Sequence, residues 1–430
     1  MAETAQRPAV LFYGDDFTGA SDALATAAQG GWRSLMFLRV PDDALLARAG
    51  PLDCIGIAGA ARAMAPDEMR AALAPVAALA QRLRPQVLHY KVCSTFDSAP
   101  AVGNVAVAVD CLRGAVPSPG VVIVGGQPSL RRYCLFGQLF ASTADGDVAR
   151  IDRHPTMSRH PVTPMGEADL RRHLAQLGLP GLALLPWTQL EADGAPAAWP
   201  TGDVLVDAAR PEHLQRIGAW LMRGPAGQGV LAVGASSVME AALAASPRPT
   251  GAPPQAAAAR GPVFVLAGSQ SPNTARQVAA AESYDVVRID AVRLADPAQS
   301  GYHAALADDC DQRLRAGRHV LACTMPADDG ATPASAVPVD AHALAHAGGR
   351  LLVDVLARVP LARVGVAGGD TSSHAVLALD AWGLSFIRRV APGVPLCRVH
   401  SDRPALDGLQ IMLKGGQMGA DDLFERLLLD

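Results

Sequence analysis

The chain has 430 residues, of which 50% are hydrophobic, 4% aromatic and 18% charged, and its formal net charge is −4 at pH 7. This length predicts two domains, each able to bury a sizeable core. The slightly acidic balance, without a basic block, argues against nucleic-acid binding, and no apolar run is long enough to predict a membrane-spanning helix. The seven scattered cysteines lack C-x-x-C spacing, and the first residues lack a signal-peptide pattern, so we expect a cytoplasmic protein with reduced cysteines and no structural zinc.

Short apolar strands alternate with helices through the first half of the chain. The pattern predicts strands over residues 10–15, 33–38, 54–62, 87–92, 121–126, 202–208 and 229–234. It predicts helices over residues 17–31, 66–83 and 211–223. The helix over 66–83 is the best supported, because proline stands at its first position and acidic residues follow in its first turn. Residues 141–166 are rich in Pro, His and Arg without a clear period, which favours a loop of a binding site.

A Pro/Ala/Gly-rich stretch, residues 245–261, is the best linker in the chain. After it the alternation resumes, with strands predicted over residues 262–270, 286–290, 319–324, 363–370 and 409–416. Helices are predicted over residues 271–284, 340–358, 371–382 and 420–429. We therefore predict an α/β protein of two domains, residues 1–244 and 262–430, each with a mostly parallel sheet flanked by helices and with the active site in the cleft between them.

Three glycine-bearing turns of the second half each follow a predicted strand. They are FVLAGSQSPNT (264–274), VGVAGGDTSSHAV (364–376) and LKGGQMG (413–419). Such turns collect at the carboxyl edge of a parallel sheet, where backbone amides and a helix amino terminus can bind phosphate. Ordinary tight turns use glycine in the same way, so the sequence leaves phosphate binding and a purely structural role about equally supported. Neither the Walker A pattern nor a first-strand G-x-G-x-x-G is present.

Polar residues also follow two predicted strands of the first half. Asp15 and Asp16 are adjacent at the end of the first strand, and N-capping of a helix explains one of them but not both. We expect the pair to face a cation, a sugar hydroxyl or an arginine. Lys91 ends another strand beside a hydroxyl-rich turn, where it suits a carboxylate ligand.

A third cluster combines cations and histidines. Arg150, Arg153, His154, Arg159 and His160 fall within sixteen residues and could hold an acidic substrate, although each histidine taken singly is better explained as a structural group.

Lysine is almost absent from the chain. Only Lys91 and Lys414 occur, so 35 of the 37 basic residues are arginine. A compact ammonium cannot be exchanged freely for a planar guanidinium where its shape is used, so the two lysines are candidates for functional positions. Chance survival is the alternative explanation.

Taken in order, several of these motifs resemble the four-carbon acid sugar kinase family, which includes 3-oxo-tetronate, D-threonate and D-erythronate kinases. The motifs are GDDFTGASD, YKVCSTFDS, SRHPVTPM, AGSQSPNT, GGDTS and KGGQMG, and they span nearly the whole chain. The resemblance implies an amino-terminal domain for the sugar acid and a carboxy-terminal domain for ATP. Many members have S-T-L-R-G-N where this chain has an acid, Asp97, in place of the cation. This difference concerns the identity of the substrate, and branched keto-acids such as 3-oxo-isoapionate stay among the candidates.

The resemblance also implies functional residues. For the acid site these are Asp15, Asp16, Thr18, Lys91 and Ser94, to which we add Arg153 and His160 from the cluster above. For the nucleotide site they are Ser269, Ser271, Gly368, Gly369, Asp370, Thr371, Lys414, Gly416 and Gly419.

The mechanism that follows is in-line phosphoryl transfer from ATP to the hydroxyl of a small acid, with Mg²⁺ bridging the phosphates. Asp16 and Asp370 are the candidates for the carboxylate that accepts the hydroxyl proton, and the sequence does not choose between them. Two other classes stay open: an oxidoreductase with a nucleotide cofactor, and a non-catalytic acid-binding sensor. A homodimer is a further expectation.

Overall fold

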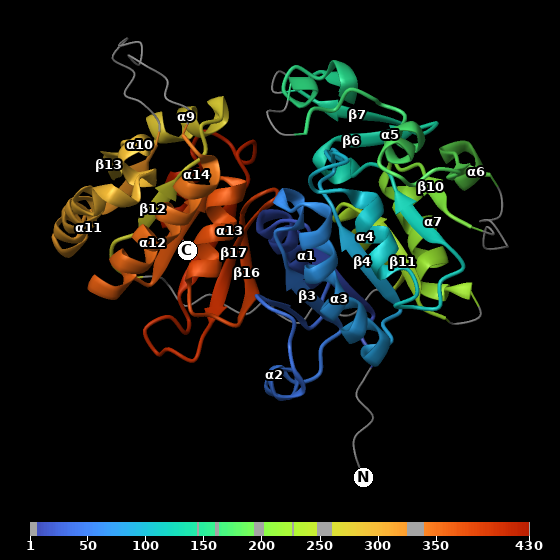
Figure 1. The fold of residues 1–430 in the computed structure, drawn as a ribbon, viewed down its shortest axis with the longest axis horizontal. Coiled ribbons are helices and arrows are strands. Elements are labelled where there is room, and N and C mark those ends of the chain that lie inside the picture. Colours follow the sequence, from blue (N-terminus) through green and yellow to red (C-terminus); the bar gives the residue numbers. More distant parts are fainter. Residues whose placement is uncertain are drawn as a thin grey trace. The chain divides into compact units, whose positions relative to one another are not determined.

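The structure, a computed structural model, describes residues 7–143, 146–159, 163–192, 202–225, 228–246, 260–324 and 339–429. The chain forms two compact units, residues 1–251 and 252–430, shown in blue to green and in yellow to red in Figure 1. Most of the predicted linker, residues 247–259, lies outside the described residues.

The first unit is built on a parallel sheet with the strand order β2-β3-β1-β4-β11-β5-β10-β9. Its strands are β1 (Val10–Gly14), β2 (Ser34–Phe37), β3 (Cys54–Ala58), β4 (Val87–Lys91), β5 (Val121–Val124), β9 (Ala183–Leu185), β10 (Val204–Val206) and β11 (Val230–Gly234). Most of these strands are apolar along their whole length, as expected when helices cover both faces of a parallel sheet.

The helices of this unit are α1 (Phe17–Gln29), α2 (Asp43–Ala49), α3 (Pro66–Leu83), α4 (Val105–Leu112), α5 (Leu170–Gln176), α6 (Trp187–Glu191), α7 (Pro211–Arg223) and α8 (Ser237–Ala245). Helices α1, α3, α4, α7 and α8 lie along that sheet, whereas α2 stands apart from it (Figure 1). The predictions of α3 and α7 are confirmed with their bounds. Helix α3 begins with proline, and the Glu68 carboxylate accepts from the amide of Ala65 at 2.8 Å, which satisfies one amide at the helix start.

A small antiparallel sheet, which we did not predict, stands beside the parallel one. Its order is β6-β7-β8, formed by β6 (Arg132–Leu135), β7 (Gln138–Ser142) and β8 (Val148–Arg150). Strand β8 therefore lies inside residues 141–166, which we predicted to be a loop throughout. The rest of that segment contains two short 3₁₀ turns, η3 (Ile151–Arg153) and η4 (Met157–Arg159).

The second unit has the strand order β13-β14-β12-β15-β18-β17-β16. The first five strands in this order pair in parallel, and β17 is antiparallel to both of its neighbours, β18 and β16. Its strands are β12 (Phe264–Ala267), β13 (Tyr284–Arg288), β14 (His319–Cys323), β15 (Arg363–Ala367), β16 (Gly383–Ala391), β17 (Val394–His400) and β18 (Gln410–Lys414). The predicted mostly parallel α/β architecture is thus confirmed for each unit.

The helices of the second unit include the two that concern the site, α9 (Pro272–Ala279) and α13 (Gly369–Ala378). The others are α10 (Ala291–Ala295), α11 (Ser300–Arg315), α12 (Ala341–Arg358) and α14 (Leu423–Leu428). Within the described residues, no helix is both long and apolar enough to cross a bilayer. The seven cysteines, all of them described, form no disulfide bond, and five of them are buried, which agrees with the predicted core role.

Candidate functional site

Three turns meet at the carboxyl edge of the second unit's sheet. They follow β12, β15 and β18, which are neighbours in the sheet. The amide of Gly368 donates to the carbonyl oxygen of Lys414 at 2.8 Å, which ties the second turn to the third. A Cβ placed on Gly268 would lie 2.2 Å from the Thr371 hydroxyl, so the first turn packs directly on α13. The strand order thus brings together the three glycine turns noted in the sequence.

The amino terminus of α13 is open. Its N-cap is Gly368, with φ +124°, a backbone conformation that glycine alone adopts readily, and no side chain caps the helix. The first-turn amides of Gly369, Asp370 and Thr371 have no acceptor within the helix, so with the helix dipole they can bind an anion. A Cβ on Gly369 would meet no atom within 4 Å, which leaves space beside this turn.

The amino terminus of α9, by contrast, is capped by a side chain. Ser271 is its N-cap: the hydroxyl accepts from the amide of Thr274 at 3.1 Å and donates to the carbonyl oxygen of Gly416 at 2.6 Å. The Ser269 hydroxyl accepts from the amide of Ser271 at 3.3 Å and faces Gly416, where an added Cβ would lie 2.9 Å away. Both serines fasten the turns to one another, and their predicted contact with nucleotide stays a prediction.

Lys414 ends β18 and is fully buried. Its Nζ atom donates to the Thr274 hydroxyl at 2.7 Å and to the carbonyl oxygen of Gly416 at 3.3 Å. No carboxylate of a described residue pairs with this ammonium. Burial accordingly lowers the pKa of Lys414 to about 7. The site therefore holds a cation that an incoming anion would stabilise.

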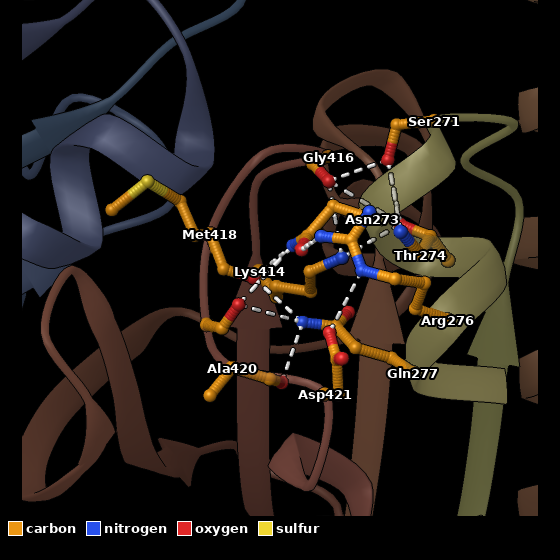
Figure 2. Close-up of polar contacts among 11 residues, drawn as sticks. Ser271, Asn273, Thr274, Arg276, Gln277, Lys414, Gly416, Met418, Ala420 and Asp421 are labelled. Atoms are coloured by element: carbon orange, nitrogen blue, oxygen red, sulfur yellow. Dashed lines mark hydrogen bonds and ion pairs between the residues drawn. The ribbon is translucent and has the colours of Figure 1, made fainter. Parts of the chain in front are cut away.

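Side chains of α9 hold the loop that follows β18, residues 415–421 (Figure 2). Asn273 and Gln277 donate between them, at 3.0 to 3.2 Å, to three consecutive carbonyl oxygens, those of Met418, Gly419 and Ala420. An ion pair between Arg276 and Asp421, at 3.0 Å, lies beside them. The loop is thereby fixed to a helix of the same unit rather than left free. Its anchors Asn273, Thr274 and Gln277 were not among the predicted site residues.

The burial of Lys414 predicts a pH dependence of stability. Because its pKa is lower in the folded protein than in the unfolded chain, the unfolded chain binds more protons from about pH 7 up to the usual lysine range, and stability rises with pH there. We expect the free energy of unfolding of wild type, relative to Lys414→Met, to increase between pH 7 and the usual lysine range. Urea titrations followed by circular dichroism at several pH values measure this difference, and parallel curves for the two proteins would contradict it.

In the first unit, two aspartates follow β1. Asp16 is the N-cap of α1: its Oδ1 atom accepts from the amide of Gly19 at 2.6 Å, and its Oδ2 atom accepts from the Thr18 hydroxyl at 3.3 Å. Asp15, one residue earlier, is buried and caps nothing. The prediction that capping explains one aspartate and not the other is confirmed.

Arg62 is the partner of both aspartates. Its Nε and Nη2 atoms bind the two oxygens of Asp15 at 3.1 and 2.8 Å, and its Nη1 atom lies 2.5 Å from Asp16 Oδ2. The residue lies in a 3₁₀ turn, η1 (Ala61–Ala63), directly after β3, the neighbour of β1 in the sheet. The sequence predicted that the acidic pair faces a partner, with arginine among the options, but did not identify Arg62. The predicted strand over residues 54–62 ended at Arg62, whereas β3 ends at Ala58; an arginine at the end of a predicted strand was the available signal.

Burial and this ion pair act on the two carboxyls differently. Burial raises the pKa of both groups. At Asp15 burial outweighs the attraction of Arg62, and the pKa is raised. At Asp16 the charges of Arg62 and Lys91, with the Gly19 amide and the Thr18 hydroxyl, outweigh burial and lower the pKa. Asp16 is therefore the more firmly ionised of the two.

Lys91 lies against the first turn of α1. It is 5% exposed, and its ammonium makes no hydrogen bond or ion pair with a described residue. A Cβ on Gly19 would lie 2.0 Å from Lys91 Nζ and 2.5 Å from Asp16 Oδ1, so the ammonium and the carboxylate are neighbours across a position that has room only for glycine. A buried, unpaired cation at a helix amino terminus suits an anionic ligand.

The turn after β4 carries the remaining candidates. Ser94 is half-buried there, and Phe96 adopts φ +55°, a left-handed conformation that is rare for an aromatic residue. The carboxylate of Asp97 is buried and accepts from the hydroxyls of Thr95 and Thr163, the latter at 3.4 Å. Strain at Phe96 and a buried acid at Asp97 mark this turn as specialised.

The Arg/His cluster is not assembled as a site within the described residues. The Arg153 side chain is 76% exposed and lies 3.8 Å from Asp152. His154 is structural: its Nε2 atom lies 3.1 Å from the carbonyl oxygen of Ser142, and its Nδ1 atom accepts from the amides of Thr156 and Met157. His160 lies outside the described residues.

Two family profiles match the chain. One, described as a sugar-binding N-terminal domain, matches residues 10–242, and the other, described as a nucleotide-binding C-terminal domain, matches residues 264–424. The 3-oxo-isoapionate kinase of Paraburkholderia graminis is 39% identical, over 96% of this chain and 93% of that protein. The 3-oxo-tetronate kinase of Methylobacterium radiotolerans is 30% identical, over 96% of this chain and 97% of that protein.

Two solved structures share the fold. A protein of Salmonella typhimurium LT2, provisionally described as a tRNA synthase, aligns with a TM-score of 0.78 at 22% identity, over 97% of this chain and 98% of that one. A Haemophilus influenzae protein aligns with a TM-score of 0.69 at 23% identity, with the same coverage. At these identities the likeness supports the fold alone.

Proposed function

The chain belongs to the four-carbon acid sugar kinase family, and on that premise we propose that it transfers the γ-phosphoryl group of ATP to a hydroxyl of a small sugar acid. The observation that carries the proposal lies in the second unit: the glycine N-cap leaves the amides of α13 open, beside the buried ammonium of Lys414, while the neighbouring helix α9 is capped by its own serine. Open amides next to a cation without a carboxylate partner are what a polyphosphate needs.

We assign the nucleotide to the second unit. The phosphates bind the first-turn amides of α13, from Gly369 to Thr371, and Lys414 supplies the neighbouring positive charge. The loop at residues 415–421, held by α9, forms the other wall of this site. Phosphoryl transfer asks for positioning and charge neutralisation rather than covalent chemistry, and these groups provide both.

Mg²⁺ fits this arrangement through one residue. Asp370 is exposed in the first turn of α13 and makes no hydrogen bond or ion pair with a described residue. Mg²⁺ in nucleotide sites keeps several waters and is bound by phosphates with one or two carboxylates, so a single free carboxylate suffices. When bound, the ion would neutralise phosphate charge, and Asp370 would hold it.

We assign the sugar acid to the first unit. The unpaired ammonium of Lys91 attracts the acid, and Thr18 and Ser94 offer hydroxyl groups beside it. Asp15 and Arg62 hold one another and keep the edge of the sheet rigid. Asp16 is then placed to accept the proton of the attacking hydroxyl, because it is ionised and lies next to Lys91.

The names of the relatives support a choice of the first substrate to test. Identity reaches 39% with a 3-oxo-isoapionate kinase and 30% with a 3-oxo-tetronate kinase. The buried carboxylate of Asp97, where many members have a cation, also separates this chain from the typical pattern. We propose a branched 3-oxo acid such as 3-oxo-isoapionate as the first substrate to test. The absence of disulfide bonds among the cysteines and the use of ATP support a cytoplasmic reaction.

A coupled assay of ADP release tests the function. The purified protein with Mg-ATP is given 3-oxo-isoapionate, 3-oxo-tetronate, D-erythronate, D-threonate and a neutral sugar in separate reactions. We expect at least one acid to stimulate ADP release and the neutral sugar to have no effect. ADP release that no acid stimulates would contradict the kinase assignment, and reduction of NAD by the same panel would favour an oxidoreductase.

A further inference from the structure

Arg132 occupies a fixed position near the end of another central strand of the first unit. The chain leaves β5, passes through a 3₁₀ turn, η2 (Pro128–Leu130), and enters β6 at Arg132. The backbones of Arg132 and Gln127 exchange two hydrogen bonds, of 2.8 and 3.1 Å. The start of β6 is thereby anchored to the segment that leaves β5, at the edge of the sheet where Asp15, Arg62 and Lys91 lie.

Only one of the three guanidinium nitrogens of Arg132 makes a hydrogen bond to a described residue. Its Nη1 atom donates to the carbonyl oxygens of Leu130 at 2.8 Å and Arg131 at 3.4 Å. Its Nε atom is buried and has no partner, and neither Nε nor Nη2 bonds to a described residue. The Nε–Nη2 edge can bind the two oxygens of a carboxylate side by side. A buried donor without a partner destabilises the folded protein, so a ligand that binds there is a physical explanation for it.

The surroundings of Arg132 support this explanation. Burial lowers the pKa of its guanidinium, and the neighbouring Arg131 acts in the same direction; Cys93 lies close enough to interact electrostatically with this group. The Cys93 thiol in turn lies within the electrostatic influence of Arg62 and Lys91. Cys93 therefore links Arg132 to the group of residues assigned to the acid.

The other cations of this edge are less suited to the role. Arg62 already binds two aspartates. Lys91 carries a compact ammonium, which cannot bind the two oxygens of a carboxylate side by side as a guanidinium does. We propose that Arg132 binds the carboxylate of the sugar acid through its Nε–Nη2 edge and so makes the enzyme specific for acids. This inference rests on the proposed function and adds a specificity-determining residue to it.

The test compares Arg132→Lys and Arg132→Gln with wild type and with a control, Arg131→Gln. Arg131 is the adjacent arginine; it is exposed, and among the described residues its side chain donates only to the carbonyl oxygen of Gly146. Binding of D-erythronate without nucleotide is measured by calorimetry, and KM values for the acid and for ATP by the ADP assay. Loss of a charge-assisted bond is expected to weaken acid binding by about 10- to 100-fold in Arg132→Lys. The KM for ATP, and both constants in Arg131→Gln, should change less than about twofold, within the scatter of a surface substitution.

An uncharged analogue of the acid distinguishes a loss of carboxylate recognition from a general loss of folding. D-erythronamide lacks the carboxylate charge, so the Arg132 variants should lose the preference of wild type for the acid over the amide. An equal loss of affinity for the acid and the amide, or an unchanged affinity for the acid in Arg132→Lys, would overturn the proposal. If wild type binds the acid but transfers no phosphate, the kinase proposal fails, and the calorimetric comparison still decides the role of Arg132. If wild type binds none of the acids, both proposals fall.

Discussion

Replacing Asp16 with asparagine is expected to lower kcat by about 10²- to 10⁴-fold, the range that a positioned proton acceptor contributes. Asparagine is as good an N-cap as aspartate, so its side-chain oxygen can still accept from the Gly19 amide and α1 should form normally. What is lost is the charge that faces Arg62 and Lys91 and the ability to take up a proton. Steady-state kinetics with the best acid of the panel, together with a thermal melt, measure the effect.

A matched control exists elsewhere in the first unit. Asp42 is the N-cap of α2, accepts from the amide of Leu45 at 2.8 Å and makes no ion pair with a described residue. Asp42→Asn therefore makes the same chemical change at a helix start away from the candidate residues, and we expect unchanged kinetics. If Asp16→Asn kept kcat within a fewfold and raised only the KM for the acid, Asp16 would be a binding group and not the base.

Replacing Lys414 with methionine is expected to raise the KM for ATP by about 10- to 100-fold, because a charge-assisted bond to phosphate is lost. The variant should still fold, and should be at least as stable as wild type at neutral pH, because an apolar side chain of similar length replaces a buried ammonium that no carboxylate neutralises. Nucleotide titration by calorimetry and chemical denaturation measure the two quantities independently.

Lys91, the other lysine, allows the complementary experiment. Lys91→Met should raise the KM for the acid and leave the KM for ATP unchanged, since Lys91 belongs to the first unit and Lys414 to the second. Unchanged ATP affinity in Lys414→Met, or equal effects of both substitutions on both substrates, would contradict the division of roles between the units.

The sequence predicted those parts of the fold that a regular pattern encodes. Apolar runs of four to six residues gave the parallel strands, and Pro66 with Asp67 and Glu68 marked the start of α3. The three glycine turns could be identified one by one, but only the strand order, with β12, β15 and β18 adjacent, shows that they meet. The scarcity of lysine pointed to two positions, and both are buried at strand ends.

Other features depend on contacts that spacing does not encode. Arg62 lies 46 residues beyond Asp16 in the chain and reaches it only because β3 pairs with β1. The proximity of Gly19 to Lys91 likewise comes from the crossing of α1 over β4. The hairpin of β16 and β17 was missed although Pro392 and Gly393, with φ +70° at the glycine, stand at its turn, because the alternation of strand and helix led us to expect no antiparallel pair there.

The loop between Gly415 and Asp421 has a polarity that follows from how it is fastened. Its carbonyl oxygens at Gly416, Met418, Gly419 and Ala420 all accept from Lys414 or from side chains of α9. In every peptide group the N–H bond points away from the C=O bond. Turning these four carbonyl oxygens inward therefore points the N–H groups that follow them, at Gln417, Gly419, Ala420 and Asp421, away from α9, so this loop favours negatively charged oxygens even before any side-chain charge is counted.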